Sequence, residues 1–213
     1  MENFLILQLK GVTQAWGGHT YEDLRHSEII PTRSGLLGLL AACLGVDRSD
    51  AKSLSDLSAS MIMAVRSDSN PVRITDFHTV MNARKVDGKP GQYPVVSRRE
   101  YLCDAQFTIV LMNAPDAKTK LVDISKAVRT PVYTPFLGRR SCAITRPLYY
   151  GEVEAENFSD VFNAIEPSVG VVYSDIRLAE NDTRMQLRDK PIHGRARQFA
   201  TRDIYIHQTS QGA

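Results

Sequence analysis

The segment Gly138-Arg139-Arg140-Ser141-Cys142 brings several phosphate-binding groups together within a few residues. A guanidinium donates paired hydrogen bonds in a geometry that matches a phosphate, and a glycine lets a ligand approach the backbone closely. The hydroxyl group of the serine adds another donor. These residues predict a phosphate-binding turn, and the alternative is a surface turn whose two arginines are only solvated.

A loop at residues 14–21 carries planar side chains that could stack on unpaired bases. It places Gln14 and Trp16, the only tryptophan of the chain, close to Tyr21. Stacking on an aromatic side chain contributes about 1–3 kcal/mol per base. The loop therefore predicts a base-stacking site, although Trp16 would serve equally well as a plug at the edge of the core.

A predicted helix start at Thr32-Arg33-Ser34, shortly after Arg25, offers another place for a phosphate. The first backbone N–H groups of a helix lack partners within it, and the helix dipole attracts an anion to that end. Thr32 would cap the helix in either case. Phosphate binding beside Arg33 is therefore an additional hypothesis.

The basic residues are unevenly distributed, although the formal net charge is only +2. Residues 184–202 hold six basic residues and the single acid Asp189. A second basic stretch, around residues 84–99, includes Arg98 and Arg99, and a third ends at Arg146. The total charge does not indicate a nucleic-acid partner, and the distribution of the charges is more informative. Each basic stretch taken alone is also compatible with a solvated loop.

The histidines and cysteines do not predict a metal site or a cofactor. The five histidines lack metal-binding spacing, and the cysteines Cys43, Cys103 and Cys142 are odd in number and far apart. Metal-independent cleavage of RNA needs only a positioned base and a cation, which His78 or His26 could supply. Single histidines are more often structural, so catalysis remains the alternative to binding.

The hydrophobic pattern predicts an α+β fold. Strands are expected at residues 4–9, 61–66, 101–112, 147–155, 169–173 and 199–207, and helices at 32–45, 121–128 and 158–165. The polar stretch at residues 73–99, with an Asp87-Gly88 turn signal, predicts a protruding basic hairpin. The order of these elements is that of the ferredoxin-like arrangement found in many RNA-binding modules.

The composition indicates a folded cytoplasmic protein. A chain of 213 residues with 43% hydrophobic content can bury a sizeable core. Its longest run of apolar residues and glycine, residues 35–45, is shorter than the roughly 20 residues of a membrane-spanning helix. The N-terminus lacks a secretory pattern, and three free thiols suit a reducing compartment.

The sequence resembles the CasD family, whose members bind the 5′ handle of the guide RNA (crRNA) in type I-E CRISPR Cascade complexes and belong to the repeat-associated RNA-binding (RAMP) superfamily. The resemblance extends over nearly the whole chain in five blocks that keep the same order. These blocks are residues 14–17, 31–40, 99–105, 133–142 and 197–200.

The resemblance implies a ferredoxin-like or RRM-like N-terminal domain at residues 1–146, with an inserted hairpin "thumb" at about 73–99, and a small β-rich C-terminal part at 147–213. It also implies a non-catalytic subunit that caps the crRNA 5′ handle and nucleates the backbone assembly for antiviral DNA targeting. The expected RNA-binding residues are Gln14, Trp16, Tyr21, Arg25, Thr32, Arg33, Ser34, Arg98, Arg99, Gly138, Arg139, Arg140, Ser141 and Cys142.

The resemblance further implies the partners of such a subunit. They are the crRNA, the repeated backbone subunit beside the thumb and the large subunit that finds the target, with target DNA nearby and no membrane. A relative in type I-C systems processes the repeat RNA itself, which keeps a metal-independent endoribonuclease as the alternative. A free-standing RRM-like regulator is disfavoured, because the predicted strands lack the aromatic pair of the usual RRM signature.

Overall fold

A seven-stranded sheet forms the body of the protein in this computed structural model, which describes residues 1–21, 23–83, 88–194 and 198–209. The order of its strands is β11-β12-β10-β5-β8-β1-β9, and every neighbouring pair is antiparallel. The strands are β1 (Glu2–Lys10), β5 (Met61–Ser67), β8 (Gln106–Asn113), β9 (Tyr149–Ala155), β10 (Gly170–Ser174), β11 (Thr183–Pro191) and β12 (Phe199–Thr209).

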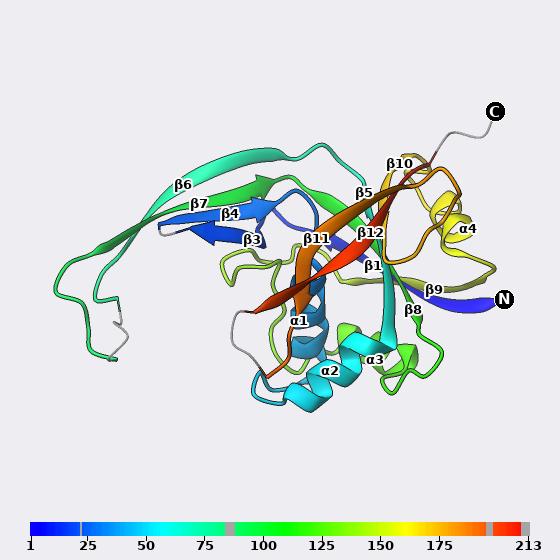
Figure 1. The fold of residues 1–213 in the computed structure, drawn as a ribbon, viewed down its shortest axis with the longest axis horizontal. Coiled ribbons are helices and arrows are strands. Elements are labelled where there is room, and N and C mark those ends of the chain that lie inside the picture. The colour runs from blue at the N-terminus through cyan, green and yellow to red at the C-terminus, as the bar shows by residue number, and fades with distance from the viewer. Residues whose placement is uncertain (22, 84–87, 195–197, 210–213) are drawn as a thin grey trace.

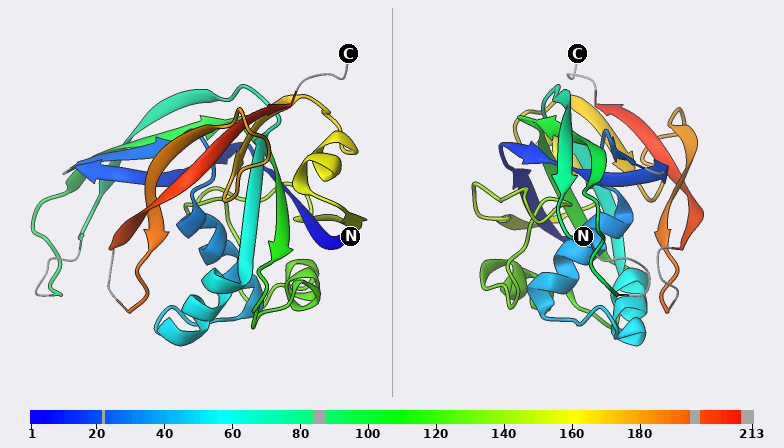
Figure 2. Two further views of the ribbon diagram at one scale, coloured as in Figure 1. Left: turned by 45° about the vertical axis from the view of Figure 1, so that its right-hand side comes forward. Right: turned by 90° about the vertical axis from the view of Figure 1, so that its left-hand side faces the viewer.

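Helices pack against both faces of this sheet, because its central strands are apolar on both sides. On β1, Leu5 and Leu7 belong to one hydrophobic core, whereas Phe4 and Ile6 belong to the other. The first core includes residues of α1 (Arg33–Leu44), α2 (Ala51–Ser60) and α3 (Leu121–Arg129), and the second includes residues of α4 (Phe158–Asn163). Figure 2 shows α4, in yellow, well apart from α1 and α2, in blue and cyan. The two-sided burial explains why β1 reads as an almost continuous apolar run.

The chain passes from β1 through α1 and α2 to β5, then through β8 and α3 to β9. In space, β8 lies between β5 and β1, and β9 lies on the far side of β1. The strands after residue 147 join this same sheet, because β9 pairs with β1 and β10 pairs with β5. Hydrogen bonding therefore ties the expected C-terminal part directly to the first part.

A second sheet carries a hairpin that extends far from the body (Figure 1). The hairpin consists of β6 (Val72–Val80) and β7 (Val95–Cys103), which pair in continuous register from Val72–Cys103 to Val80–Val95. It lies where the thumb was expected. The base of β7 also pairs with β2 (Thr13–Gln14) and β4 (Leu24–Glu28), and β4 pairs with β3 (Trp16–Tyr21).

The prediction of one strand at residues 101–112 is wrong. The chain breaks at Asp104, whose φ of 56° is left-handed, so that β7 stays in the second sheet and β8 enters the first. A residue in this conformation turns the chain sharply, and aspartate tolerates it better than most residues. The helix α2 and the strands β2, β3, β4 and β11 were not predicted.

Candidate nucleic-acid interface

The turn at residues 138–142 is pressed against the segment between β2 and β3. Gly138 has φ +85°, and a Cβ atom placed on it would lie 1.8 Å from the carbonyl oxygen of Ala15. The backbone N–H of Ala15 donates to Leu137 O at 3.1 Å, and Cys142 is fully buried beneath the turn. Gly138 is thus required by the fold, in addition to any role in admitting a ligand.

The two arginines of the turn have different environments. Arg139 donates from Nη1 to Glu100 O at 2.7 Å and from Nη2 to Arg25 O at 2.9 Å, and its guanidinium lies 4.6 Å from the ring centroid of Tyr101. Arg140 is exposed and makes no hydrogen bond or ion pair with the described part of the chain. Arg139 therefore anchors the turn to the second sheet, while Arg140 and the exposed Ser141 remain available to a ligand.

Gln14 and Trp16 are buried in the core. Trp16 is 0% exposed, and its Nε1 donates to Gln14 Oε1 at 3.0 Å. The Gln14 amide in turn donates to the carbonyl oxygens of Leu9 and Ala105. The Trp16 ring also packs against Gly35 of α1, where an added Cβ would come within 2.8 Å of the ring. A ring in this position cannot stack on a base, so Trp16 has the core-filling role that was the alternative.

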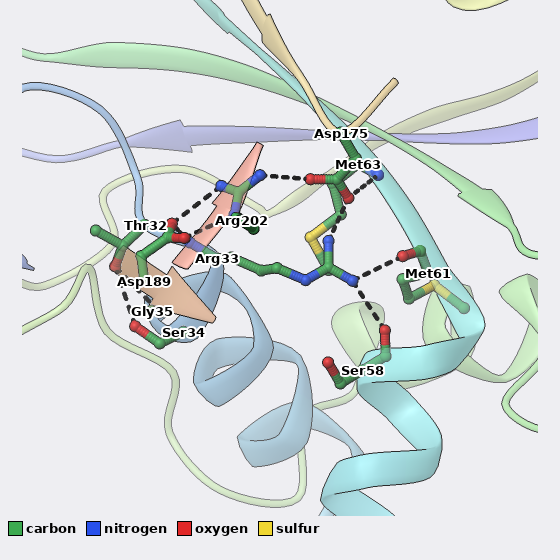
Figure 3. A network of polar contacts seen from close by, with 10 residues as sticks. All are labelled: Thr32, Arg33, Ser34, Gly35, Ser58, Met61, Met63, Asp175, Asp189 and Arg202. Carbon is green, nitrogen blue, oxygen red and sulfur yellow. Dashed lines mark hydrogen bonds and ion pairs between the residues drawn. The ribbon is translucent and has the colours of Figure 1, made fainter. Parts of the chain in front are cut away.

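The N-terminus of α1 holds an anion that belongs to the protein itself (Figure 3). The backbone N–H of Arg33 donates to Asp189 Oδ2 at 2.6 Å, and Thr32 accepts from Gly35 N as the N-cap. The Arg33 guanidinium binds the Asp175 carboxylate and donates to the carbonyl oxygens of Ser58 and Met61. Arg33 is therefore structural, and the phosphate expected at this helix end would have to displace Asp189.

Arg202 completes this network from β12. It donates to Asp189 from Nε at 2.6 Å and from Nη2 at 3.0 Å, and to Asp175 from Nη1 at 2.6 Å. The network therefore links α1 to the C-terminal strands, because Arg202 contacts both carboxylates and Arg33 also contacts both, through its guanidinium and its backbone N–H. The sequence did not reveal this role because each acid lies far from Arg33 along the chain. Ser34, the next residue of the predicted phosphate site, stays partly exposed, and its hydroxyl lies near that of Thr32.

The remaining candidates lie on or near the second sheet. Arg25 on β4 and Arg98 on β7 are exposed, and Arg98 lies 3.4 Å from the carboxylate of Asp23. Arg99 is half-buried and donates to the hydroxyl of Ser97 at 3.0 Å. Tyr21 ends β3, but its side chain, like the basic residues at 84, 85, 195 and 197, lies outside the described part of the structure.

Glu100, at the base of the hairpin, binds His26 and two other groups. Its carboxylate accepts from His26 Nδ1 at 3.0 Å, from Ser27 N at 3.1 Å and from Arg73 Nη1 at 3.4 Å. Burial raises the pKa of Glu100, but these hydrogen bonds and the neighbouring positive charges outweigh burial, so that its pKa is lowered. Glu100 therefore connects β4, β6 and β7 as a carboxylate.

His78 and His26 do not form one catalytic site. In the register of the hairpin, His78 is opposite Ser97, which lies an odd number of positions from Glu100 on β7. Side chains at such positions point to opposite faces of a sheet. His26 contacts Glu100 and is therefore on the other face from His78. In the described ranges, no three histidine, cysteine or acidic side chains come together as a metal site would require.

The hairpin presents large apolar side chains to solvent. Phe77 is 65% exposed, and Tyr93, between the two strands, is 75% exposed. The other exposed apolar residues on its strands are Val72, Ile74, Val95 and Val96. Exposed apolar surface of this kind is typical of a segment that binds another molecule.

No helix among the described residues is both long and apolar enough to span a bilayer.

Comparisons with known proteins agree with this architecture. A family model described as "CRISPR-associated protein (Cas_Cas5)" matches residues 4–205. The chain is 42% identical to the CRISPR system Cascade subunit CasD of Escherichia coli (strain K12), over 97% of this chain and 96% of that protein. It is similar to a chain of a CRISPR RNA-guided surveillance complex, with a TM-score of 0.78 and 27% identity over 97% of this chain and 90% of that chain. It is also similar to a crystal structure of a Cas protein, with a TM-score of 0.70 and 28% identity over 97% and 94% of the two chains. This chain is therefore a member of the CRISPR-associated Cas5 family.

Proposed function

We propose that this chain is the non-catalytic subunit of a type I-E Cascade complex that binds and caps the 5′ handle of the crRNA. The observation that carries the proposal is its 42% identity to CasD, a Cascade subunit, across 97% of the chain. In this role the chain nucleates the backbone assembly that carries the guide to its DNA target. Its partners are the crRNA, the repeated backbone subunit and the large subunit.

The strand order supports a ferredoxin-like platform for this function. In the order β5-β8-β1-β9, the unit formed by β1, α1 and β5 interleaves with the unit formed by β8, α3 and β9, as the split βαβ units of a ferredoxin-like fold do. RRM modules bind RNA on the open face of their sheet. Here helices pack on both faces of the sheet, so we expect the RNA contacts on the surrounding loops. Here the turn at residues 138–142, with Arg140 and Ser141 exposed, is the part of the predicted site best able to contact a phosphate.

The β6–β7 hairpin supports the proposed contact with the repeated backbone subunit. It reaches out of the body and exposes Phe77, Tyr93 and the apolar residues of its strands. A segment of this shape fits a docking role, in which it props against the adjacent backbone subunit and displaces a nucleotide of the guide. Removing the side chain of Phe77 should then weaken assembly without affecting the folded chain.

Binding is favoured over cleavage because the chain resembles CasD of type I-E systems, in which a separate subunit cuts the repeat RNA. His26 and His78 also lie on opposite faces of the hairpin sheet, so they cannot act together in one catalytic site. The test is to incubate the purified chain with end-labelled CRISPR repeat RNA in excess chelator, beside a His78→Ala variant. We expect intact RNA in both samples. Specific cutting that is lost in the variant would make this chain a processing endoribonuclease instead.

A further inference from the structure

The turn at residues 138–142 borders a cleft that sequence analysis did not identify. The cleft has a volume of about 1080 Å3 and lies between the C-terminal end of α3 and the loop segments at residues 131–136 and 143–149. Arg140 forms part of its wall. The cleft therefore adjoins Arg140, the predicted RNA-binding arginine whose side chain has no partner in the described part of the chain.

The walls of this cleft are positively charged. Three arginines, Arg129, Arg140 and Arg146, line it, and none of the described residues in its lining is acidic. Arg140 and Arg146 make no hydrogen bond or ion pair with the described part of the chain, whereas Arg129 donates to Glu152 at 3.1 Å. Two guanidinium groups thus face the cleft without a counter-charge, which is an arrangement suited to phosphate groups.

Aromatic rings lie next to these charges. Tyr133 is 51% exposed, and Phe136 is 36% exposed. The ring of Tyr149 is already covered by the guanidinium of Arg129, at 3.7 Å from the ring centroid. Tyr133 and Phe136 are therefore the rings on which an unpaired base can stack.

A second large cleft provides a contrast within the same molecule. It follows α1, has a volume of about 950 Å3, and is lined mainly by glycine, alanine and apolar residues. Tyr133 and Phe136 border both clefts, so the contrast lies in the arginines and not in the rings. Among the described residues of its lining, the arginine is Arg48, which follows directly after the acidic Asp47 in the same lining. Arg48 is exposed and makes no hydrogen bond or ion pair with the described residues, so it is a matched control for Arg140 and Arg146.

We propose that the cleft between α3 and residues 131–149 binds a segment of single-stranded RNA, with Arg140 and Arg146 on its phosphates and Tyr133 stacked on one base. This inference rests on the proposed function and adds Arg146 and Tyr133 to the RNA-binding residues. A protein segment is a poorer occupant, because two unpaired arginines beside open aromatic rings match a polyanion with exposed bases.

The test assembles the complex on its full guide RNA at several salt concentrations and measures the affinity of the subunits for that guide at each one. Each lost phosphate contact lowers the slope of log K against log salt concentration by roughly 0.7 for a single strand. We expect Arg140→Ala and Arg146→Ala each to lower the slope by this amount and to weaken binding roughly ten-fold. Tyr133→Ala should weaken binding by about five-fold or more with no change of slope. Arg48→Ala should change neither quantity.

The outcomes separate failure of this inference from failure of the proposed function. If the unsubstituted complex binds the guide and both arginine variants keep its slope, the cleft does not lie on the RNA path. If the unsubstituted chain makes no contact with the 5′ handle, the proposed function itself fails. A photo-crosslinking amino acid in place of Thr134, which lines this cleft and is not among the described residues of the second one, provides a second readout. A cross-link to RNA supports the inference, and a cross-link to another subunit overturns it.

Discussion

The backbone N–H of Arg33 donates to the carboxylate of Asp189 at 2.6 Å, which places an acidic side chain of β11 at the N-terminus of α1. The same carboxylate receives two hydrogen bonds from Arg202. An anion at this position satisfies the unpaired N–H groups of the helix and interacts favourably with its dipole. Asp189 thus fastens the C-terminal strands to the helix that covers the central sheet.

Replacing Asp189 with alanine should strongly destabilise the fold. Arg202 would lose two of its carboxylate contacts in a mostly buried position, and removal of one partner from a buried ion pair costs about 3–5 kcal/mol. The free energy of unfolding, measured by urea denaturation, checks this prediction. Asp203→Ala is the control, because Asp203 forms an exposed pair with Arg184 and should cost at most about 1 kcal/mol. Equal losses for the two variants would contradict the structural role of Asp189.

Gly138→Ala should be more destabilising than Gly88→Ala. Both glycines have a left-handed φ, +85° and +79°, so an alanine at either position carries about the same 1–2 kcal/mol of backbone strain. At Gly138 the added Cβ would also meet Ala15 O at 1.8 Å, whereas nothing lies within 4 Å of it at Gly88. The difference between the two melting temperatures measures the clash alone. Similar melting temperatures would show that the turn does not rest against Ala15.

The adjacent arginines of the turn should separate into two phenotypes. Arg139→Ala loses two hydrogen bonds to backbone carbonyl oxygens and the contact with Tyr101, so we expect a stability loss of about 2 kcal/mol. Arg140→Ala should leave thermal stability unchanged and weaken guide binding, because its side chain is exposed and unpaired among the described residues. Thermal unfolding and guide binding, measured on both variants, check the assignment. If Arg139→Ala weakened guide binding alone and Arg140→Ala lowered stability alone, the two assignments would be reversed.

Glu100 should make the base of the hairpin sensitive to acid. Because its pKa is lowered from the ordinary value of 4.5, its contribution to stability is fully present above that pH and is lost as the pH falls through the lower pKa of the folded state. Glu100→Gln should therefore be less stable than the unsubstituted chain at pH 7, and the difference should shrink below about pH 4.5. Melting temperatures of both proteins from pH 7 to pH 3 test this. A difference that stays constant over this range would exclude a titrating role for Glu100.

Local signals in the sequence were sufficient to predict α1. Thr32 caps its first turn, and Gly45 ends it with a φ of +74°, as the residue types at those positions predict. The polar stretch at residues 73–99 likewise predicted the hairpin that β6 and β7 form, whereas residue 87 of the expected Asp87-Gly88 turn lies outside the described residues. These features depend on residues that are close together in the chain, so they can be read from sequence.

The features that sequence reasoning missed depend on contacts between distant residues. Arg33 finds its acidic partners 142 and 156 positions away, so nothing local distinguishes it from a phosphate ligand. The break at Asp104 was missed because the apolar alternation continues across it, although the chain changes sheet there. Arg146 and Tyr133 come together with Arg140 only through the folding of the loop at residues 131–149.

The most direct test of the central claim is chemical footprinting of the crRNA 5′ handle in complexes assembled with and without this chain. A subunit that caps the handle without cutting it predicts that the handle nucleotides are protected only when the chain is present, and that the RNA stays intact. Equal reactivity of the handle in both assemblies, or a new 5′ end produced by the chain, would contradict the account.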